Sequence, residues 1–244
     1  MPAALQRSST LVVLCAGALR GILKELAPQF EERAGHQISV IYERSGVVSA
    51  RVLEGDIVDV VITTDEHISE LARHQKIVPE SIAAVAGSRI GVAVHAGANR
   101  PDIGSVAAFI KTLLTSKSIA YADPATGSPS GNHFVHIIDR LGIAADLASK
   151  SLRICPSEGS VVIVCEAVAS GKAEIGIQQI SEILAVPGVE LVGALPPELQ
   201  QTTLFSAAVT ASAGSRELAR LFVAYITSEE VSPVVRMKGM ERVI

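Results

Sequence analysis

Short apolar segments alternate along this chain with segments whose apolar residues recur every three or four positions. A short, uninterrupted apolar run is typical of a buried strand, and apolar residues that recur every three or four positions are typical of one face of a helix. The first three strand and helix pairs are residues 11–15 and 19–30, residues 38–42 and 47–53, and residues 58–63 and 68–71. Because this alternation is characteristic of parallel sheets covered by helices, the sequence predicts an α/β fold.

The rest of the chain continues this alternation, with a loop predicted at residues 86–88 and a Gly- and Ser-rich loop at residues 123–131. Further strands are predicted at residues 90–94, 119–122, 173–177, 189–192 and 205–209, and further helices at residues 106–114, 134–141, 161–169 and 217–226. Residues 90–94 and 205–209 resemble paired strands that cross between two lobes. We therefore expect lobe I to comprise residues 1–85 and 205–244, and lobe II residues 86–204. The alternative is one doubly wound sheet.

Composition excludes several classes of protein. Hydrophobic residues make up 48% of the 244 residues and charged residues 19%, which fits a packed globular protein rather than a disordered one. A net charge of -4 provides no general attraction to nucleic acid. No apolar run reaches the roughly 20 residues of a membrane span. The sequence contains neither a nucleotide-binding fingerprint nor His and Cys residues at metal-ligand spacing, so we predict no cofactor and no metal.

The apolar residues 11–19 lie close to the start of the sequence but are interpreted as a strand. They lack the charged segment and the small-residue cleavage site of a secretory signal. We therefore expect either a cytoplasmic protein or a periplasmic protein whose export signal has been removed. Cys15 and Cys165 lie within apolar patterns and are expected to be core residues.

Small and hydroxyl residues precede several of the predicted helices. Gly17 and Ala18 precede the helix at residue 19, Ser45 precedes the helix at residue 47, and Ser130 and Gly131 precede the helix at residue 134. A fourth segment, residues 157–160, precedes the helix at residue 161. Helix N-termini carry unpaired N–H groups and a partial positive charge. Several such ends in one cleft predict a site for a small anion.

The order and spacing of these segments resemble those of the periplasmic molybdate-binding proteins, a type II solute-binding family. The segments that carry the resemblance are residues 12–19, 42–46, 54–62, 123–131 and 171–176. The resemblance implies the two-lobed periplasmic-binding-protein type II fold, with mixed, mainly parallel sheets and flanking helices. It also implies a small oxyanion or carboxylate as ligand in a cleft between the lobes and an ABC permease as partner.

The resemblance also implies which residues contact the ligand. Two serines of the family fall on Ala18, which lacks the hydroxyl, and on Ser45, which keeps it. Two residues that supply backbone N–H groups fall on Ser130 and Val161. The tyrosine of the family falls on Gln179, so two of the three side-chain ligands are changed.

Arg44 suggests an alternative ligand and an alternative activity. Arg44 stands beside Ser45, and a guanidinium binds carboxylates with two hydrogen bonds. Relatives of the molybdate-binding proteins include an isomerase that interconverts cis- and trans-aconitate. An isomerase of a tricarboxylic acid on the same fold is therefore the second hypothesis, with His133, Glu43 and Glu158 as candidates for the catalytic base. A third hypothesis is a ligand-sensing module, which would need another subunit.

Overall fold

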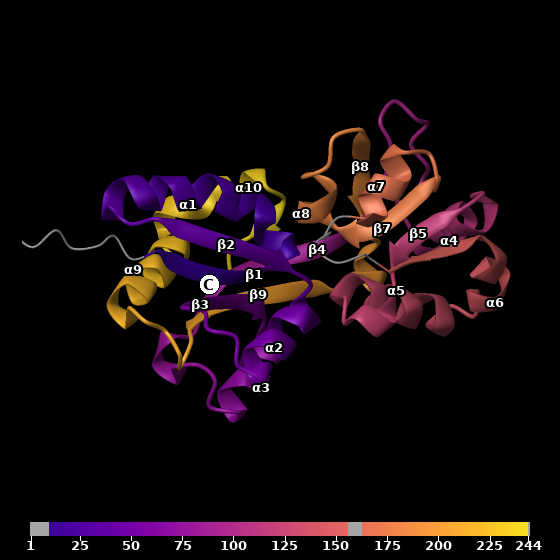
Figure 1. Cartoon of the computed structure of the whole chain (residues 1–244). Helices are drawn as coiled ribbons and strands as arrows, with labels where there is room; N and C mark the ends of the chain where they lie inside the picture. Colours follow the sequence, from indigo (N-terminus) through magenta and orange to yellow (C-terminus); the bar gives the residue numbers. More distant parts are fainter. Residues whose placement is uncertain (1–9, 156–162, 244) are drawn as a thin grey trace, which may run out of the picture.

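The computed structural model describes residues 10–155 and 163–243. It shows strands joined into one mixed sheet with helices on its faces, which confirms the predicted α/β class (Figure 1). The strands are β1 Leu11–Ala16, β2 Ile38–Glu43, β3 Val60–Thr64, β4 Ala83–His95, β5 Ile119–Ala122, β6 Ser151–Ile154, β7 Ile175–Gln179, β8 Val189–Ala194, β9 Thr202–Val209 and β10 Met240–Glu241. The helices are α1 Arg20–Ala34, α2 Ser45–Glu54, α3 Asp65–Arg73, α4 Val106–Thr115, α5 Pro129–Arg140, α6 Ala144–Leu147, α7 Ile163–Ala169, α8 Ile180–Ile183, α9 Arg216–Ile226 and α10 Ser232–Met237.

The sheet order is β2-β1-β3-β9-β4-β7-β5-β6, with β8 and β10 also paired to β4. In the first half of the sheet, β1 lies between β2 and β3 and is parallel to both. In the second half, β5 lies between β6 and β7 and is again parallel to both. Parallel neighbours end at the same edge of a sheet, so each half presents the starts of its following helices together.

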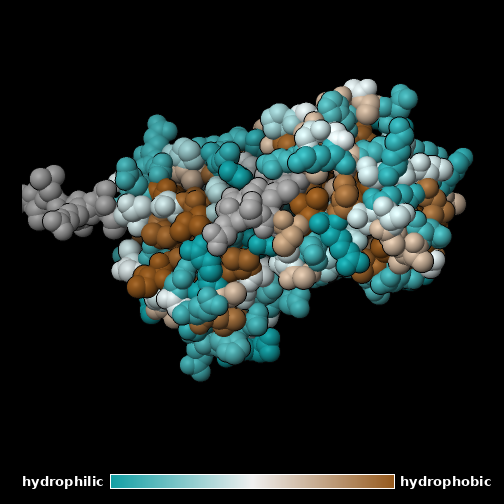
Figure 2. Space-filling model, turned by 45° about the vertical axis from the view of Figure 1, so that its right-hand side comes forward, coloured by the Kyte–Doolittle hydropathy of each residue, from teal (hydrophilic) through white to brown (hydrophobic). Residues whose placement is uncertain are grey.

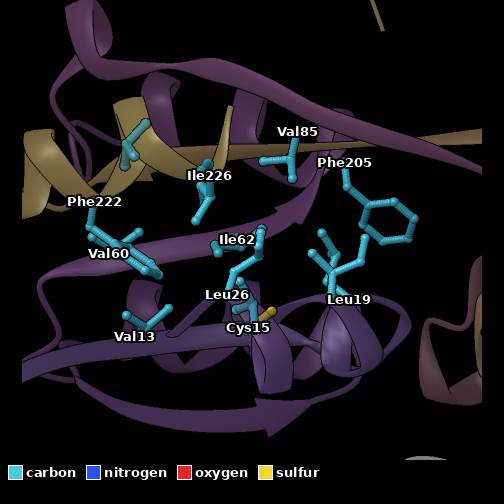
Figure 3. Close-up of a cluster of buried hydrophobic side chains, with 14 of the residues drawn as sticks. Val13, Cys15, Leu19, Leu26, Val60, Ile62, Val85, Phe205, Phe222 and Ile226 are labelled. Atoms are coloured by element: carbon cyan, nitrogen blue, oxygen red, sulfur yellow. The ribbon is translucent and has the colours of Figure 1, made fainter. Parts of the chain in front are cut away.

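The core of the first half follows from the alternation of side chains along β1. Val13 and Cys15 point to one face, where they pack with residues of α1 and α9 (Figure 3). Leu14 points to the opposite face and packs with residues of α2 and α3. Because both faces are covered, the strand is apolar throughout, which explains the uninterrupted run in the sequence.

The second half has its own core. Tyr121 of β5 packs against Phe134 of α5 with ring centroids 4.9 Å apart, within a cluster that also includes residues of β4, β7 and α4. Ala122 lies on the opposite face of β5 and packs with residues of α7. The core of this half therefore has a small aromatic centre.

Strands β4 and β9 connect the two halves, and their pairing corrects two predictions. Ala83 to Arg89 pairs with β9, whereas the predicted crossing residues 90–94 pair with β7 and β8. The predicted loop at residues 86–88 lies inside β4. Gly87 lies in a paired strand rather than in a turn, and a Cβ there would lie 2.8 Å from the Thr202 side chain, which would have to move. The predicted lobe boundaries, after residues 85 and 204, stay predictions.

Helix α5 also differs from the prediction, which placed its start at Phe134. The helix begins at Pro129, five residues earlier, and includes Ser130 and Gly131 in its first turn. Proline is well suited to the first helical position because its missing N–H has no intrahelical partner there. The prediction that Ser130 and Gly131 belong to a loop is therefore wrong.

The surface shows hydrophobic residues as separate patches among hydrophilic ones on the face in Figure 2. Within the described residues, no helix is both long and apolar enough to span a membrane.

Candidate anion site between two helix starts

Helices α2 and α5 begin next to one another, although they follow strands in different halves of the sheet. Arg44 is the N-cap of α2, directly after β2, and Ser128 is the N-cap of α5. Among the described residues, the Ser128 hydroxyl accepts no hydrogen bond from its own helix, and the Arg44 guanidinium has no acceptor with which to cap α2. The first backbone N–H groups bonded to these N-cap carbonyls are those of Val48 and Asn132. The preceding N–H groups of each first turn are therefore free of intrahelical partners.

Glycine backbones bring these two helix starts into contact. A Cβ built on Gly46 would lie 3.4 Å from the Cα of Gly127, so the two segments are already in van der Waals contact. Gly127 has φ +70°, a left-handed conformation that favours glycine. The turn before α5 therefore needs a residue without a side chain for its own conformation as well as for this contact.

A cavity of about 30 Å³ lies beside this contact, with walls from both halves of the sheet. The lining residues are Gly17, Ala18, Arg44, Ser45 and Phe205 from the first half and Ser128, Pro129, Gln179 and Glu182 from the second. Five residues predicted to bind ligand, namely Gly17, Ala18, Arg44, Ser45 and Gln179, thus line one space. Their role as ligand contacts stays a prediction.

Several polar side chains in the second half of the sheet form hydrogen bonds within the protein. The hydroxyl of Ser130 donates to Oε1 of Gln178 and lies 3.2 Å from the hydroxyl of Ser128. Nε2 of Gln179 donates to the Thr203 hydroxyl over 2.9 Å, while its Oε1 is buried without a partner among the described residues. Because the Thr203 hydroxyl can also donate, the Gln179 amide can present either its oxygen or its nitrogen to the cavity.

Glu182 is a carboxyl group in a cavity that is also lined by the Arg44 guanidinium and two serines. It lies on the short helix α8, lines the cavity and is 8% exposed. Burial raises the pKa of Glu182 to about 8, because the charged form loses its hydration. The group is therefore mostly protonated at neutral pH.

The family of bacterial extracellular solute-binding proteins matches residues 11–241. The chain belongs to this family. Its relatives include an aconitate isomerase of a Pseudomonas species, 30% identical over 246 residues, which cover 98% of this chain and 90% of the relative. A molybdate-binding protein of Rhodobacter capsulatus is 23% identical over 220 residues, covering 88% of this chain and 82% of the relative.

Solved structures show the same fold. The periplasmic molybdate-binding protein of Azotobacter vinelandii superposes with a TM-score of 0.78 at 22% identity, covering 96% of this chain and 99% of that one. This likeness confirms the predicted periplasmic-binding-protein fold. The relatives also confirm the resemblance to the molybdate-binding family.

Two of the candidate catalytic bases of this solute-binding protein have other partners. Nε2 of His133 lies 2.7 Å from the carbonyl oxygen of Leu199, and His133 lines a separate cavity of about 550 Å³. The carboxylate of Glu43 lies 3.6 Å from Arg51. Neither arrangement directs the side chain at the small cavity.

Ser130 and Gly131 are predicted ligand residues that do not line the small cavity. Gly131 packs against the backbone of Ala122, at the point where α5 crosses the end of β5. Val161 and Glu158 lie outside the described residues. Within residues 10–155 and 163–243, no group of three or more His, Cys, Asp or Glu residues is arranged to hold a metal ion.

Sequence reasoning missed two polar residues of the cavity. Ser128 lies in the loop predicted at residues 123–131, but the family resemblance implies Ser130, not Ser128, as the ligand residue of that loop. Glu182 follows Gln179 by three residues, within an apolar segment that shows no motif. The signal available for Glu182 is its position as a lone acidic residue in an apolar segment. Such a segment is expected to be buried, and acidic residues are rarely buried without a specific role or partner.

Proposed function

We propose that this solute-binding protein captures a small anion, either a molybdate-like oxyanion or a carboxylate, in the cavity between the starts of α2 and α5. The observation that carries the proposal is that Arg44 and Ser45 from one half line the same cavity as Ser128 from the other. Hydroxyls, a guanidinium and helix N-termini all donate hydrogen bonds, which suits an anion.

The size of the cavity implies that the protein opens to admit its solute. The cavity of about 30 Å³ is small for a tetrahedral oxyanion or a carboxylic acid. Separation of Gly46 from Gly127, which join the two helix starts beside the cavity, would widen it. We infer that the two predicted lobes hinge at β4 and β9, the strands that connect them.

We propose a periplasmic location and an ABC permease as the partner that receives the solute. The support is the family of extracellular solute-binding proteins, which matches nearly the whole chain.

Ligand binding is tested by a thermal-shift screen of molybdate, tungstate, sulfate, and di- and tricarboxylates. We expect one of these classes to raise the unfolding temperature, since a ligand that binds only the folded state stabilises it. Ser45→Ala and Ser128→Ala are each expected to weaken binding by about 1–3 kcal/mol, while the exposed control Ser149→Ala leaves it unchanged. Stabilisation by none of the probes would contradict the proposal.

A second candidate function is isomerisation of a tricarboxylic acid. The observation that favours it is the aconitate isomerase that is 30% identical over nearly the whole chain. Arg44 in the cavity adds support, because helix ends and hydroxyls alone offer little to a ligand with up to three charges.

Arg44→Ala separates a carboxylate from a molybdate-like ligand. If the solute is a carboxylic acid, the change should cost about 1.5–3 kcal/mol in affinity or in kcat/KM, the scale of a charged hydrogen bond. If the solute is molybdate-like, the change should have little effect. Arg73→Ala, at an exposed arginine of α3, is the matched control.

The assay for the isomerase is the ultraviolet absorbance of cis- and trans-aconitate with wild type and both arginine variants. No isomerisation by wild type, together with tight molybdate binding that Arg44→Ala leaves intact, would reject the enzyme.

A further inference from the structure

We propose that Glu182 contacts the bound solute as a neutral carboxyl group and donates its proton in a hydrogen bond to the anion. The inference rests on the proposed binding of an anion in the cavity between α2 and α5. It adds to that site a ligand-contacting residue and a proton that is bound together with the solute.

The position of Glu182 is the first step. Its side chain lines the same small cavity as Arg44, Ser45 and Ser128, and the residue is 8% exposed. A solute large enough to touch the two serines and the arginine therefore also touches the carboxyl group. Glu182 is the one acidic side chain among the residues that line this cavity, and the other polar side chains there are neutral or positively charged.

The charge state of Glu182 is the second step. An ionised carboxylate beside a bound anion is strongly repelled in a site with little water, whereas a protonated carboxyl donates a hydrogen bond. Burial already favours the protonated form in the free protein, with a pKa of about 8. The negative charge of a bound solute raises this pKa further, because it disfavours the ionised form.

The surroundings of Glu182 do not reverse this preference. The guanidinium of Arg44 shares the cavity. The neighbouring space beside Ser181 is lined by Arg20 and Lys24 of α1 and by the ion pair of Glu25 with Lys238. On α7, the Cys165 thiol has its pKa raised by burial and by the charge of Glu182. Burial remains the cause that sets the pKa of Glu182, despite these cations.

Binding should consequently depend on pH in one direction. Below about pH 8 the carboxyl is already protonated, and affinity is constant. Above it, the protein must take up a proton when it binds, so affinity falls about ten-fold per pH unit. Between about pH 6.5 and about pH 9.5 the expected loss is roughly 30-fold.

The experiment compares wild type with Glu182→Gln, which keeps the shape of the side chain and a hydrogen-bond donor but cannot ionise. The probes are molybdate and trans-aconitate, and affinity is measured by titration calorimetry from about pH 6.5 to about pH 9.5. In wild type we expect the 30-fold loss, together with uptake of about one proton per bound probe near pH 9, found by comparing buffers of different ionisation enthalpy. Glu182→Gln should bind with nearly constant affinity and without proton uptake, and Glu54→Gln, at the exposed end of α2, should behave as wild type.

The outcomes distinguish this inference from the function on which it rests. Binding by wild type with equal affinity across the pH range and without proton uptake overturns the role of Glu182 and leaves the anion site intact. The same pH dependence in wild type and Glu182→Gln also overturns it. If neither probe binds at any pH and no compound of the thermal-shift screen stabilises the protein, the proposed function is overturned as well. Because proton uptake is measured on wild type, the test does not depend on the folding of the variant.

Discussion

Gly131 should be the glycine whose replacement by alanine is most damaging near the candidate site. A Cβ at this position would overlap the carbonyl oxygen of Ala122 and lie 3.0 Å from its carbonyl carbon. An ordinary contact needs about 1 Å more, so α5 would have to move away from β5. Strand β5 cannot yield, because it is paired to β6 on one side and β7 on the other. Overpacking costs about 1–3 kcal/mol where side chains can adjust, and here both obstacles are backbone. We expect a loss of about 3 kcal/mol or more.

Urea unfolding followed by circular dichroism measures this loss from the shift in midpoint. The control is Gly21→Ala in α1, where the added Cβ would lie 3.6 Å from the flexible side chain of Lys238, an ordinary contact. Alanine is the better helix former by about 1 kcal/mol, so Gly21→Ala should be neutral or stabilising. A Gly131→Ala protein that loses less than about 1 kcal/mol would refute the packing argument.

Two further outcomes are expected from the folded protein as a whole. Because the pKa of Glu182 is raised, the stability that this group contributes is complete below the ordinary carboxyl pKa and is lost as the pH rises to about 8. Over this range the unfolding free energy of wild type should fall, relative to that of Glu182→Gln, by about 1.4 kcal/mol per pH unit. Parallel pH profiles of the two proteins would contradict the assignment. Small-angle scattering should show a smaller radius with a saturating ligand from the thermal-shift screen than without it, and an unchanged radius would count against a hinge at β4 and β9.

The order of strands and helices was predictable because both faces of the sheet are covered. Continuous apolar runs mark β1 and β3, and a helical stripe marks α1, so local pattern and burial agree there. The pattern failed where pairing depends on distant residues. Gly87 was read as a loop, yet it lies in β4 because β9 and β10 supply its neighbours on either side. Nothing local to residues 86–88 encodes that pairing.

The candidate site was predictable where the backbone determines it. Turn residues predict helices that start at residues 47 and 134. The structure starts these helices slightly earlier, at Ser45 and Pro129, and brings both starts to one place. Individual side chains were less predictable. Whether Ser128 or Ser130 faces the cavity depends on Gln178, which lies 48 residues beyond Ser130 and binds its hydroxyl.

The charge of the cavity shows why sequence alone leaves its chemistry open. The chain as a whole carries a net charge of -4, so attraction for an anion must arise locally. Arg44 contributes one positive charge at the cavity, and an ionised Glu182 would cancel it. At the proposed anion site, the protonation of this one carboxyl decides whether an anion is attracted or repelled, because little water separates the charges. That protonation is set by burial, which distant elements create around α8. An anion site in this fold therefore does not need to be basic in sequence, provided that its acidic group is kept from ionising.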